Sequence, residues 1–463
     1  MKFVQKGLAA LAVAASTVFA PVVAQAETLS DALVSAYKTS GLLDQQRALL
    51  RVQDENVAVA VSALRPVLSY AASFGRTLTD PVGAPPLIDS YNSSLSLSAS
   101  LLLFDFGATD TRIEIAKENV LMARDALVGV EQSVFLRAIA AYVNVISSQE
   151  NVTLQANNVR LITQELRAAR DRFDVGEVTQ TDVSIAEARL AGARATEASA
   201  KGELMIAREE YKAAIGHYPK ALSGLPRLPK LPGNLDEAKR QARLYHPDIR
   251  AAKRAVTVAE LGIKASGLSM KPTISATGNV TRSFQPSEAR SANVGVTLSG
   301  PIYSGGRLSA LYRQSIAQAE ASRASLLIAS QGVDNAVGNA WAQVAIATAS
   351  LEATDRQIRA SRVALRSARE EASLGARTTL DVLNAEAEAL DASVSQISAR
   401  ANRFYASYAL LSQLGLLTAD HLQLGIASYD PAAYYNTVKN APLRKVSPQG
   451  QKLESVLEAI GRE

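Results

Sequence analysis

Val175-Gly-Glu-Val-Thr-Gln-Thr-Asp-Val183 and Leu374-Gly-Ala-Arg-Thr-Thr-Leu-Asp-Val382 are two copies of one pattern, 199 residues apart. Both read x-Gly-x-x-Thr-x-x-Asp-Val, and each follows a long run of residues without proline. Glycine ends helices readily because it adopts left-handed backbone angles, and a threonine followed three residues later by an acid is a helix-start signal. The pattern therefore predicts that one helix ends and another begins at both places.

The repetition extends through most of the chain. The shift of 199 residues aligns residues 104–216 with 303–415 without a gap, and upstream a shift of 206 aligns Leu29 with Leu235 and Pro66 with Pro272. We therefore expect a first repeat at 27–216 and a second repeat at 235–416. The linker at 217–234 contains four prolines and is expected to be extended. Tyr142 and Trp341 occupy equivalent positions and are expected to be packing residues.

Long helices precede both copies of the pattern. In the first repeat apolar residues recur at alternating spacings of three and four, through Val120, Leu127, Val134 and on to Leu166. Such a heptad pattern indicates coiled-coil packing. Residues 107–174 contain no proline, so we expect one helix of about 100 Å. The predicted segments are long helices at 107–174 and 306–373, tip turns at 175–180 and 374–379, and returning helices at 181–215 and 380–415. A shorter helix near 42–64 is expected to cover the rest of the first rod.

Strands lie ahead of each long helix. Leu95, Leu97, Ala99 and Leu101 alternate with serines, and Val294, Val296 and Leu298 alternate with small polar residues. Period-two alternation predicts strands with one apolar and one polar face, in β-hairpins at 66–104 and 272–303. A turn-rich loop at 80–86 would close the first hairpin. Four strands cannot close a barrel in a membrane, because about eight are the minimum. Either several chains share one barrel, or the strands form a small soluble sheet.

The N-terminus and the composition restrict the function. Residues 1–26 combine two lysines, an apolar stretch at 8–19 and the small-residue site Ala24-Gln-Ala26, which is the pattern of a secretory signal peptide. The chain has no cysteine, so disulfides and thiolate chemistry are excluded. Its net charge of +5 is spread along the sequence, which argues against a nucleic-acid partner. The three histidines are scattered and no nucleophile–base pair stands out, so we expect no enzyme activity, metal or cofactor.

Two motifs, taken with the doubled plan, resemble a known family. Pro301-Ile-Tyr-Ser-Gly-Gly-Arg307 and Leu374-Gly-Ala-Arg-Thr-Thr-Leu-Asp-Val-Leu383 are similar to motifs of TolC-type outer-membrane efflux and secretion channels, and the resemblance covers about residues 27–417. It implies a mainly helical homotrimer in which twelve strands close a β-barrel in the outer membrane and twelve helices close an α-barrel across the periplasm. The implied function is passive exit of substrates from an inner-membrane efflux pump or type I secretion system, with a periplasmic adaptor as a further partner.

The resemblance also implies a gate where the tips of the helical hairpins converge. It pairs Arg377 with Thr181 and Asp182, and it places Asp381 at the constriction. Asn384 stands where the family has a second aspartate. The resemblance thus implies a less negative aperture than in the best-known members.

A simpler reading of the tip residues follows from helix chemistry alone. Thr179 with Asp182, and Thr378 with Asp381, are also typical of helix N-caps with an acid in the first turn. This role is compatible with gating. Ala372 replaces a tyrosine that is common in the family, which implies a looser lock.

A second function stays open at this point. A soluble periplasmic coiled-coil adaptor or scaffold would share the signal peptide and the helical hairpins but would need no lipid-facing strands. The tail at 417–463 has no counterpart in the repeats, and we expect its segment 429–435 to form a packed loop around the middle of the tunnel.

Overall fold

The computed structural model describes residues 26–79, 88–285, 287–426 and 429–443, together with residues 448, 451, 452 and 455. Within them the chain forms nine helices and four strands. In chain order these are α1 (Leu29–Thr39), α2 (Gly41–Ser62), β1 (Val67–Thr79), β2 (Ile88–Phe104), α3 (Ala108–Asp174), α4 (Gln180–Ile215), α5 (Leu235–Tyr245), α6 (Pro247–Leu268), β3 (Thr273–Gln285), β4 (Ala289–Ser299), α7 (Arg307–Ser373), α8 (Thr379–Gln413) and α9 (Pro431–Val438). The mainly helical fold with four antiparallel strands is confirmed. The signal peptide and the loop at 80–86 lie outside the described residues, apart from residue 26.

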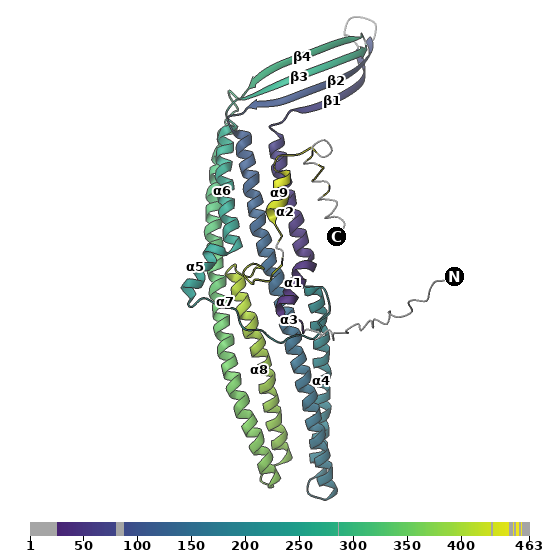
Figure 1. The fold of residues 1–463 in the computed structure, drawn as a ribbon, viewed down its shortest axis with the longest axis vertical. Helices are drawn as coiled ribbons and strands as arrows, with labels where there is room; N and C mark the ends of the chain where they lie inside the picture. The colour runs from purple at the N-terminus through teal and green to yellow at the C-terminus, as the bar shows by residue number, and fades with distance from the viewer. Residues whose placement is uncertain are drawn as a thin grey trace, which may run out of the picture.

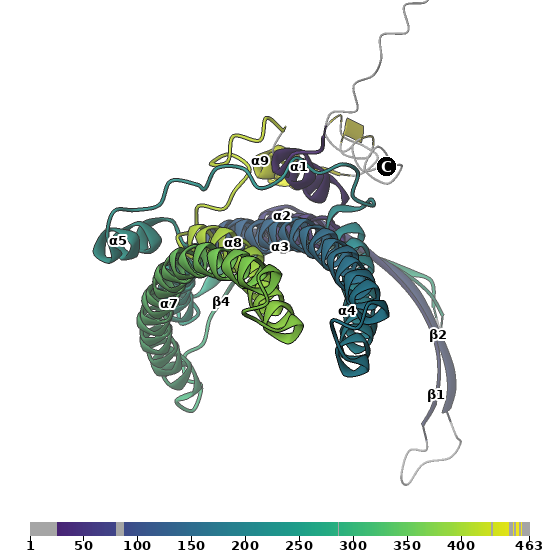
Figure 2. The ribbon, with the colours of Figure 1, turned by 90° about the horizontal axis from the view of Figure 1, so that it is seen from below.

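Two rods of 67 residues each, α3 and α7, run along the whole helical part (Figure 1). Each pairs with its returning helix in the lower half, α3 with α4 and α7 with α8. In the upper half α2 packs on α3, and α6 lies between α3 and α7. Seen from below, α7, α8, α3 and α4 follow an arc, and α1, α5 and α9 lie on its outer side (Figure 2).

The rods are held at their middle by the largest core cluster. Phe135, Ile139 and Tyr142 of α3 are fully buried there. The hydroxyl of Tyr142 donates to the backbone oxygens of Glu27 or Gly224, at 3.2 and 3.1 Å, and so fixes the linker to the rod. Trp341, the equivalent residue in α7, is only partly buried, against the smaller cluster around α5.

The middle of α3 is also the most apolar helical segment of the described chain. One 18-residue window of α3 reaches a mean hydropathy of 1.4, enough by composition for a membrane span, and half of that window is buried inside the chain. Because the core cluster sits on this helix, we interpret the apolar window as core packing.

The two repeats are joined by buried charge as well as by apolar contact. Asp125 of α3 is 2% exposed and pairs with Arg250 at 2.9 Å and with Arg254 at 2.7 Å, both on α6. A buried carboxylate needs such partners because it has lost its hydration. The pairs therefore fix the register of α6 against α3.

The four strands form one antiparallel sheet in the order β1-β2-β3-β4. The hairpin of the first repeat joins that of the second through β2 and β3, where Leu97 faces Val280. β1 and β4 are the two edges of this sheet, and neither has a further strand beside it. Each edge therefore presents a row of backbone groups without ladder partners.

Register separates the residues of the sheet into two faces. The apolar face carries Leu68, Tyr70, Ala72 and Phe74 of β1, Leu95, Leu97, Ala99 and Leu101 of β2, Ile274, Ala276, Gly278 and Val280 of β3, and Ala292, Val294, Val296 and Leu298 of β4. Serine, threonine, asparagine, glycine and alanine dominate the opposite face. Val294 is 93% exposed and Tyr70 is 83% exposed, so the chain itself leaves the apolar face uncovered.

Two expectations from the sequence are wrong in detail. Strand β4 ends at Ser299, four residues before the expected end of the hairpin, because Pro301 has no N–H to continue a ladder. Segment 429–435 is not a loop, since residues 431–438 form α9. Asp430 caps α9, accepting a hydrogen bond from the backbone N–H of Ala432 at 2.8 Å, and Pro431 at the first helical position favours this start.

The C-terminal tail, which contains α9, packs along α2 toward the sheet. The backbone N–H of Tyr429 donates to the Tyr37 hydroxyl at 3.1 Å, and the Tyr434 hydroxyl donates to Glu55 at 2.6 Å. Near the sheet, the Arg65 guanidinium donates to the backbone oxygens of Asn440 and Ala441. The tail thus ties the middle of the molecule to the base of the strands.

A buried acid lies in α2 beside this tail. Asp54 is fully buried, and neither carboxylate oxygen has a hydrogen-bond partner. It shares a helix face with Leu50 and Val57, which pack against α3 and the tail. Burial raises the pKa of Asp54 to about 6, although Arg124 opposes the shift. An acid with a raised pKa in the folded state lowers stability once the pH rises above its unfolded pKa.

We expect Asp54→Asn to stabilise the folded protein at pH 8 but not at pH 4. The cost of charging Asp54 accrues between about pH 4 and pH 6 and reaches at most about 3 kcal/mol, so the amide removes it only above that window. Thermal unfolding followed by circular dichroism at the two pH values measures the difference. An equal change at both pH values would contradict the assignment of the effect to ionisation.

Candidate functional site at the tips of the helical hairpins

Both hairpin tips have the same local geometry. Gly176 and Gly375 take positive φ angles of 78° and 76°, which end α3 and α7. Thr179 and Thr378 then cap the returning helices. The two copies of the sequence pattern therefore fold into matching turns, as helix chemistry predicts.

The two tip aspartates complete capping boxes. Asp182 accepts from the Thr179 backbone N–H at 2.9 Å and hydroxyl at 2.8 Å, and Asp381 accepts from the same groups of Thr378 at 3.0 and 2.8 Å. These threonine hydrogen bonds lower the pKa of both carboxyls. Both are therefore ionised at neutral pH. The capping role expected from the sequence is present, and it leaves the negative charge at the tip.

The structure does not bring the proposed lock residues together within one chain. Arg377 is exposed, and its Nε donates to Glu371 of its own hairpin at 2.5 Å. Thr181 is exposed on the first turn of α4, and Asp182 is occupied with its cap. Among the described residues, no hydrogen bond or ion pair joins Arg377 to Thr181 or Asp182. The lock between Arg377 and the pair Thr181 and Asp182 therefore stays a prediction. It concerns an arrangement in which the tips of neighbouring hairpins converge.

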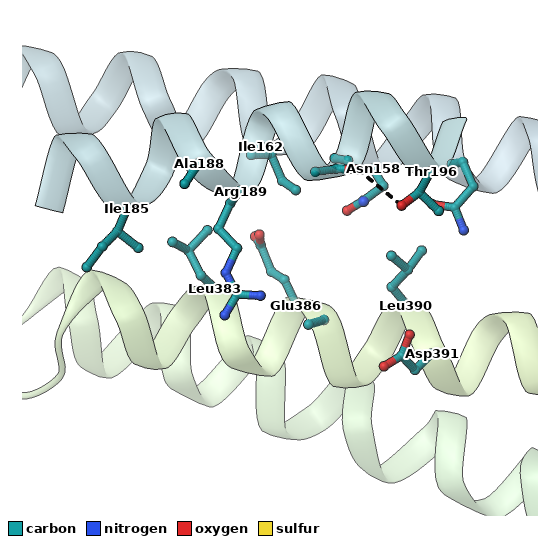
Figure 3. Close-up of a pocket in the computed structure, with 14 residues that line it drawn as sticks. Asn158, Ile162, Ile185, Ala188, Arg189, Thr196, Leu383, Glu386, Leu390 and Asp391 are labelled. Atoms are coloured by element: carbon teal, nitrogen blue, oxygen red, sulfur yellow. Dashed lines mark hydrogen bonds between the residues drawn. The ribbon is translucent and has the colours of Figure 1, made fainter. Parts of the chain in front are cut away.

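A link between the hairpins exists slightly above the tips. Arg189 of α4 donates from Nη2 to the Asn384 side-chain oxygen of α8 at 3.1 Å. Figure 3 shows Arg189 reaching from α4 across to α8. The sequence analysis identified Asn384 but missed Arg189. A signal was available, because the repeat shift places Glu388 opposite Arg189, so this position changes the sign of its charge between the repeats.

Beside this link lies a cavity of about 510 Å³ between the two hairpins, lined by α3, α4 and α8 (Figure 3). Glu386 projects into it and pairs with Arg369 of α7. Its side chain is 6% exposed, one of its oxygens has no hydrogen-bond partner, and burial raises its pKa. The equivalent Glu187 pairs with Arg170 in the same way but is 47% exposed. The repeats therefore share the ion pair, and only the second buries it at the junction.

Potential metal ligands elsewhere in the described chain are dispersed. The described residues contain no group of three or more histidine, aspartate or glutamate side chains that could hold a metal ion. His217 lies 3.4 Å from Glu27, and His246 caps α6. Both histidines therefore have local structural contacts, far from the tips along the chain.

Comparison with known proteins decides the family. A family model described as outer membrane efflux protein matches residues 32–217 and 239–416. The chain is also 35% identical over 451 residues to the outer membrane efflux protein BepC of Brucella suis biovar 1 (strain 1330), covering 96% of this chain and 97% of that protein. The chain belongs to the outer membrane efflux protein family. The resemblance drawn from the sequence is confirmed, and with it the location in the outer membrane, with the helical part in the periplasm.

Two further comparisons extend the family. The chain is 25% identical over 394 residues to the alkaline protease secretion protein AprF of Pseudomonas aeruginosa, covering 80% of this chain and 81% of that protein. The solved structure of CusC, described as forming a transmembrane channel, superposes with a TM-score of 0.74 at 19% identity, covering 84% of this chain and 92% of that one. The likeness to CusC concerns the fold. The family is one of transport channels.

We expect Arg189→Ala to raise the open probability of the channel in planar bilayers. A hydrogen bond of about 1 kcal/mol between the hairpins would be lost, which changes the ratio of closed to open states by about fivefold. Asn384→Asp should act in the opposite direction, because it turns the hydrogen bond into an ion pair.

Arg194→Ala supplies the matched control, since Arg194 is exposed on the same helix and has no described side-chain partner. Equal single-channel recordings for Arg189→Ala and Arg194→Ala would show that the link does not hold the hairpins together.

Proposed function

We propose that three copies of this chain form a passive duct across the outer membrane and the periplasm, opened at the periplasmic tips. The observation that supports this most directly is the sheet. One of its faces is apolar and uncovered, and both of its edges lack partners. A sheet of this kind suits the wall of a barrel in lipid and does not suit a protein surrounded by water.

The unpaired edges of the sheet, β1 and β4, indicate that several copies of the chain assemble. In lipid every backbone N–H and C=O must be hydrogen-bonded within protein, so a membrane sheet must close on itself. Four strands are too few to close, since about eight are the minimum. Pairing β4 of one copy with β1 of the next satisfies both edges, and the family resemblance favours three copies with twelve strands.

The apolar face is bounded like a membrane barrel wall. Phe74 and Tyr91 lie in ring contact near its far end, and Phe104 and Phe106 lie in contact near the helices, with ring centroids 6.3 and 4.7 Å apart. Aromatic residues are enriched at both membrane interfaces. The alternative of a soluble adaptor or scaffold is therefore not favoured, because it explains neither the apolar face nor its aromatic borders.

At the tips we propose that the second hairpin lines the constriction. Asp381 supplies negative charge, and Asn384 contributes its bond to Arg189 rather than a second charge. Arg377, Thr181 and Asp182 would form the lock only when tips of neighbouring hairpins converge, since within one chain Arg377 is held by Glu371.

The expected partners are two further copies of the chain, outer-membrane lipid, a periplasmic adaptor and an inner-membrane pump that supplies the energy. BepC is named for efflux and AprF for protease secretion, so both small compounds and secreted proteins fit as cargo classes.

The proposal is tested by the mass of the protein extracted from outer membranes in detergent, measured by light scattering. Three chains per particle are expected. A monomer, or a protein that leaves the membrane without detergent, would contradict the shared barrel and favour the soluble scaffold.

We expect Asp381→Ala to weaken cation selectivity at pH 7. Threonine hydrogen bonds lower the pKa of Asp381, so its carboxylate is charged at this pH, and three such charges around one axis attract cations. The measurement is the reversal potential across a salt gradient. Thr378→Ala is the matched control, because it removes the hydroxyl of the cap but keeps the carboxylate. If both variants shift the potential equally, the cap rather than the charge is responsible.

A further inference from the structure

The charged residues of the four strands all lie on the apolar face. The strands contain only four charged side chains, which are Arg76, Asp89, Arg282 and Arg290. Arg76 follows Phe74 on the apolar side of β1, and Asp89 precedes Tyr91 on that side of β2. Arg282 follows Val280 in β3, and it faces Arg290 of β4 across the ladder.

The polar face at the same level is neutral. Gly75 and Thr77 flank Arg76, Thr281 precedes Arg282, and Ser291 follows Arg290. A shift of one residue would have turned any of these arginines into the water-filled interior. If contact with lipid were the only constraint, the charged side chains would lie on the polar face. They lie on the apolar face instead.

The position of the arginines along the strands places them at one interface. They lie in the halves of the strands far from the helices, and the helices are periplasmic, so this end of the sheet meets the outer leaflet. The sheet is inclined to the helices, with β4 farther from them than β1 (Figure 1). In the register of the sheet, Arg282 and Arg290 share a row with Ala72 and Leu95, four residues before Arg76 along β1.

Aromatic rings stand beside two of the arginines. The Arg76 guanidinium lies 5.5 Å from the Tyr91 ring centroid, and that of Arg282 lies 5.0 Å from the Phe284 centroid. Tyrosine and phenylalanine at this depth mark the border between hydrocarbon and headgroups. The guanidinium groups are thus near the depth of lipid phosphates, where a lipid-facing arginine costs far less than at the bilayer midplane, and where phosphate oxygens can accept its hydrogen bonds.

The described carboxylates leave an excess of positive charge. Arg76 pairs with Asp89 through two hydrogen bonds of 2.9 Å, and Arg282 pairs with Glu288. Arg290 has no ion-pair partner in the part of the chain that the structure describes. Exposed ion pairs contribute little to stability, so Arg76 and Arg282 can exchange their carboxylates for phosphate, which guanidinium binds in two-point contacts.

We propose that Arg76, Arg282 and Arg290 bind the phosphate groups of a phosphorylated glycolipid of the outer leaflet, of the lipid A type. The acyl chains of this lipid lie on the apolar face below, over residues such as Val294 and Leu97. The site holds the barrel at its depth in the outer leaflet. The inference rests on the outer-membrane location and the sheet, and it does not depend on how the tips open.

The test counts lipid adducts on the purified protein in detergent by native mass spectrometry during titration with bisphosphorylated lipid A. We expect the wild-type protein to bind it at least about tenfold more tightly than the Arg76→Gln, Arg282→Gln, Arg290→Gln triple variant, a difference typical of one lost charged contact. Lipid A stripped of its phosphates should bind both proteins equally weakly. Inorganic phosphate at millimolar concentration should not displace the lipid, because the acyl chains contribute to its binding.

Controls keep the outcomes distinct. Lys271→Gln removes a charge at the opposite end of the sheet and should leave the affinity unchanged. If the triple variant does not fold, the single variant Arg290→Gln, which breaks no described ion pair, should still lower the affinity.

Wild-type affinity in a folded triple variant, or equally tight binding of the phosphate-free lipid to the wild type, would overturn the proposal. Displacement by inorganic phosphate would make this a simple anion site and would overturn the lipid assignment. Channel conductance of the triple variant measures the duct separately, so failure of the lipid site is distinguishable from failure of the proposed function.

Discussion

A β-sheet with open edges cannot remain in hydrocarbon, and the rest of this structure follows from that constraint. The chain supplies four strands, and β1 and β4 have no neighbours. Satisfying these edges also fixes the helices, because only three residues separate Phe104 at the end of β2 from Ala108 at the start of α3. A ring of strands therefore imposes a ring of rods beneath it. The arc of α7, α8, α3 and α4 in Figure 2 suits one copy's share of the ring that the proposed assembly would form.

The sequence predicted those parts of the fold that repeat. The heptad spacing sets the rods, and the paired Gly-x-x-Thr-x-x-Asp pattern sets the tips, because both depend on local backbone preferences that a single stretch of residues carries. α9 could not be predicted in this way. It is eight residues long and depends on long-range contacts, such as the one between Tyr434 and Glu55, which lie far apart along the chain. Pro301 shows the opposite case, since it acts by a local rule: without an N–H it cannot extend the ladder, and β4 ends at Ser299.

The position of the candidate site was predictable from the sequence. The residues that pair between the two hairpins were less so. The tip aspartates and their capping threonines follow from spacing alone. The change of charge between Arg189 and Glu388 is visible in the sequence, but the pairing of Arg189 with Asn384 became visible only in three dimensions, because Asn384 belongs to the other repeat. The two repeats differ where the hairpins face each other: Ile185 corresponds to Asn384, the exposed Glu187 corresponds to the buried Glu386, and Arg189 corresponds to Glu388. Duplication supplied two equal hairpins, and substitution at these positions made them complementary at their junction.

The charged residues of the strands and those of the tips would serve different roles in the proposed duct. The polar face of the sheet has no charged residue within the described strands, so the barrel wall that it would form contributes hydroxyls and amides but little selectivity. In the proposed duct, the ionised aspartates at the tips, about one rod length away, would be the groups that discriminate between ions. In the proposed barrel the strand charges lie on the side that faces lipid, where guanidinium groups can pair with headgroup phosphates. One end of the duct can therefore be anchored by charge without narrowing the range of compounds that pass through it.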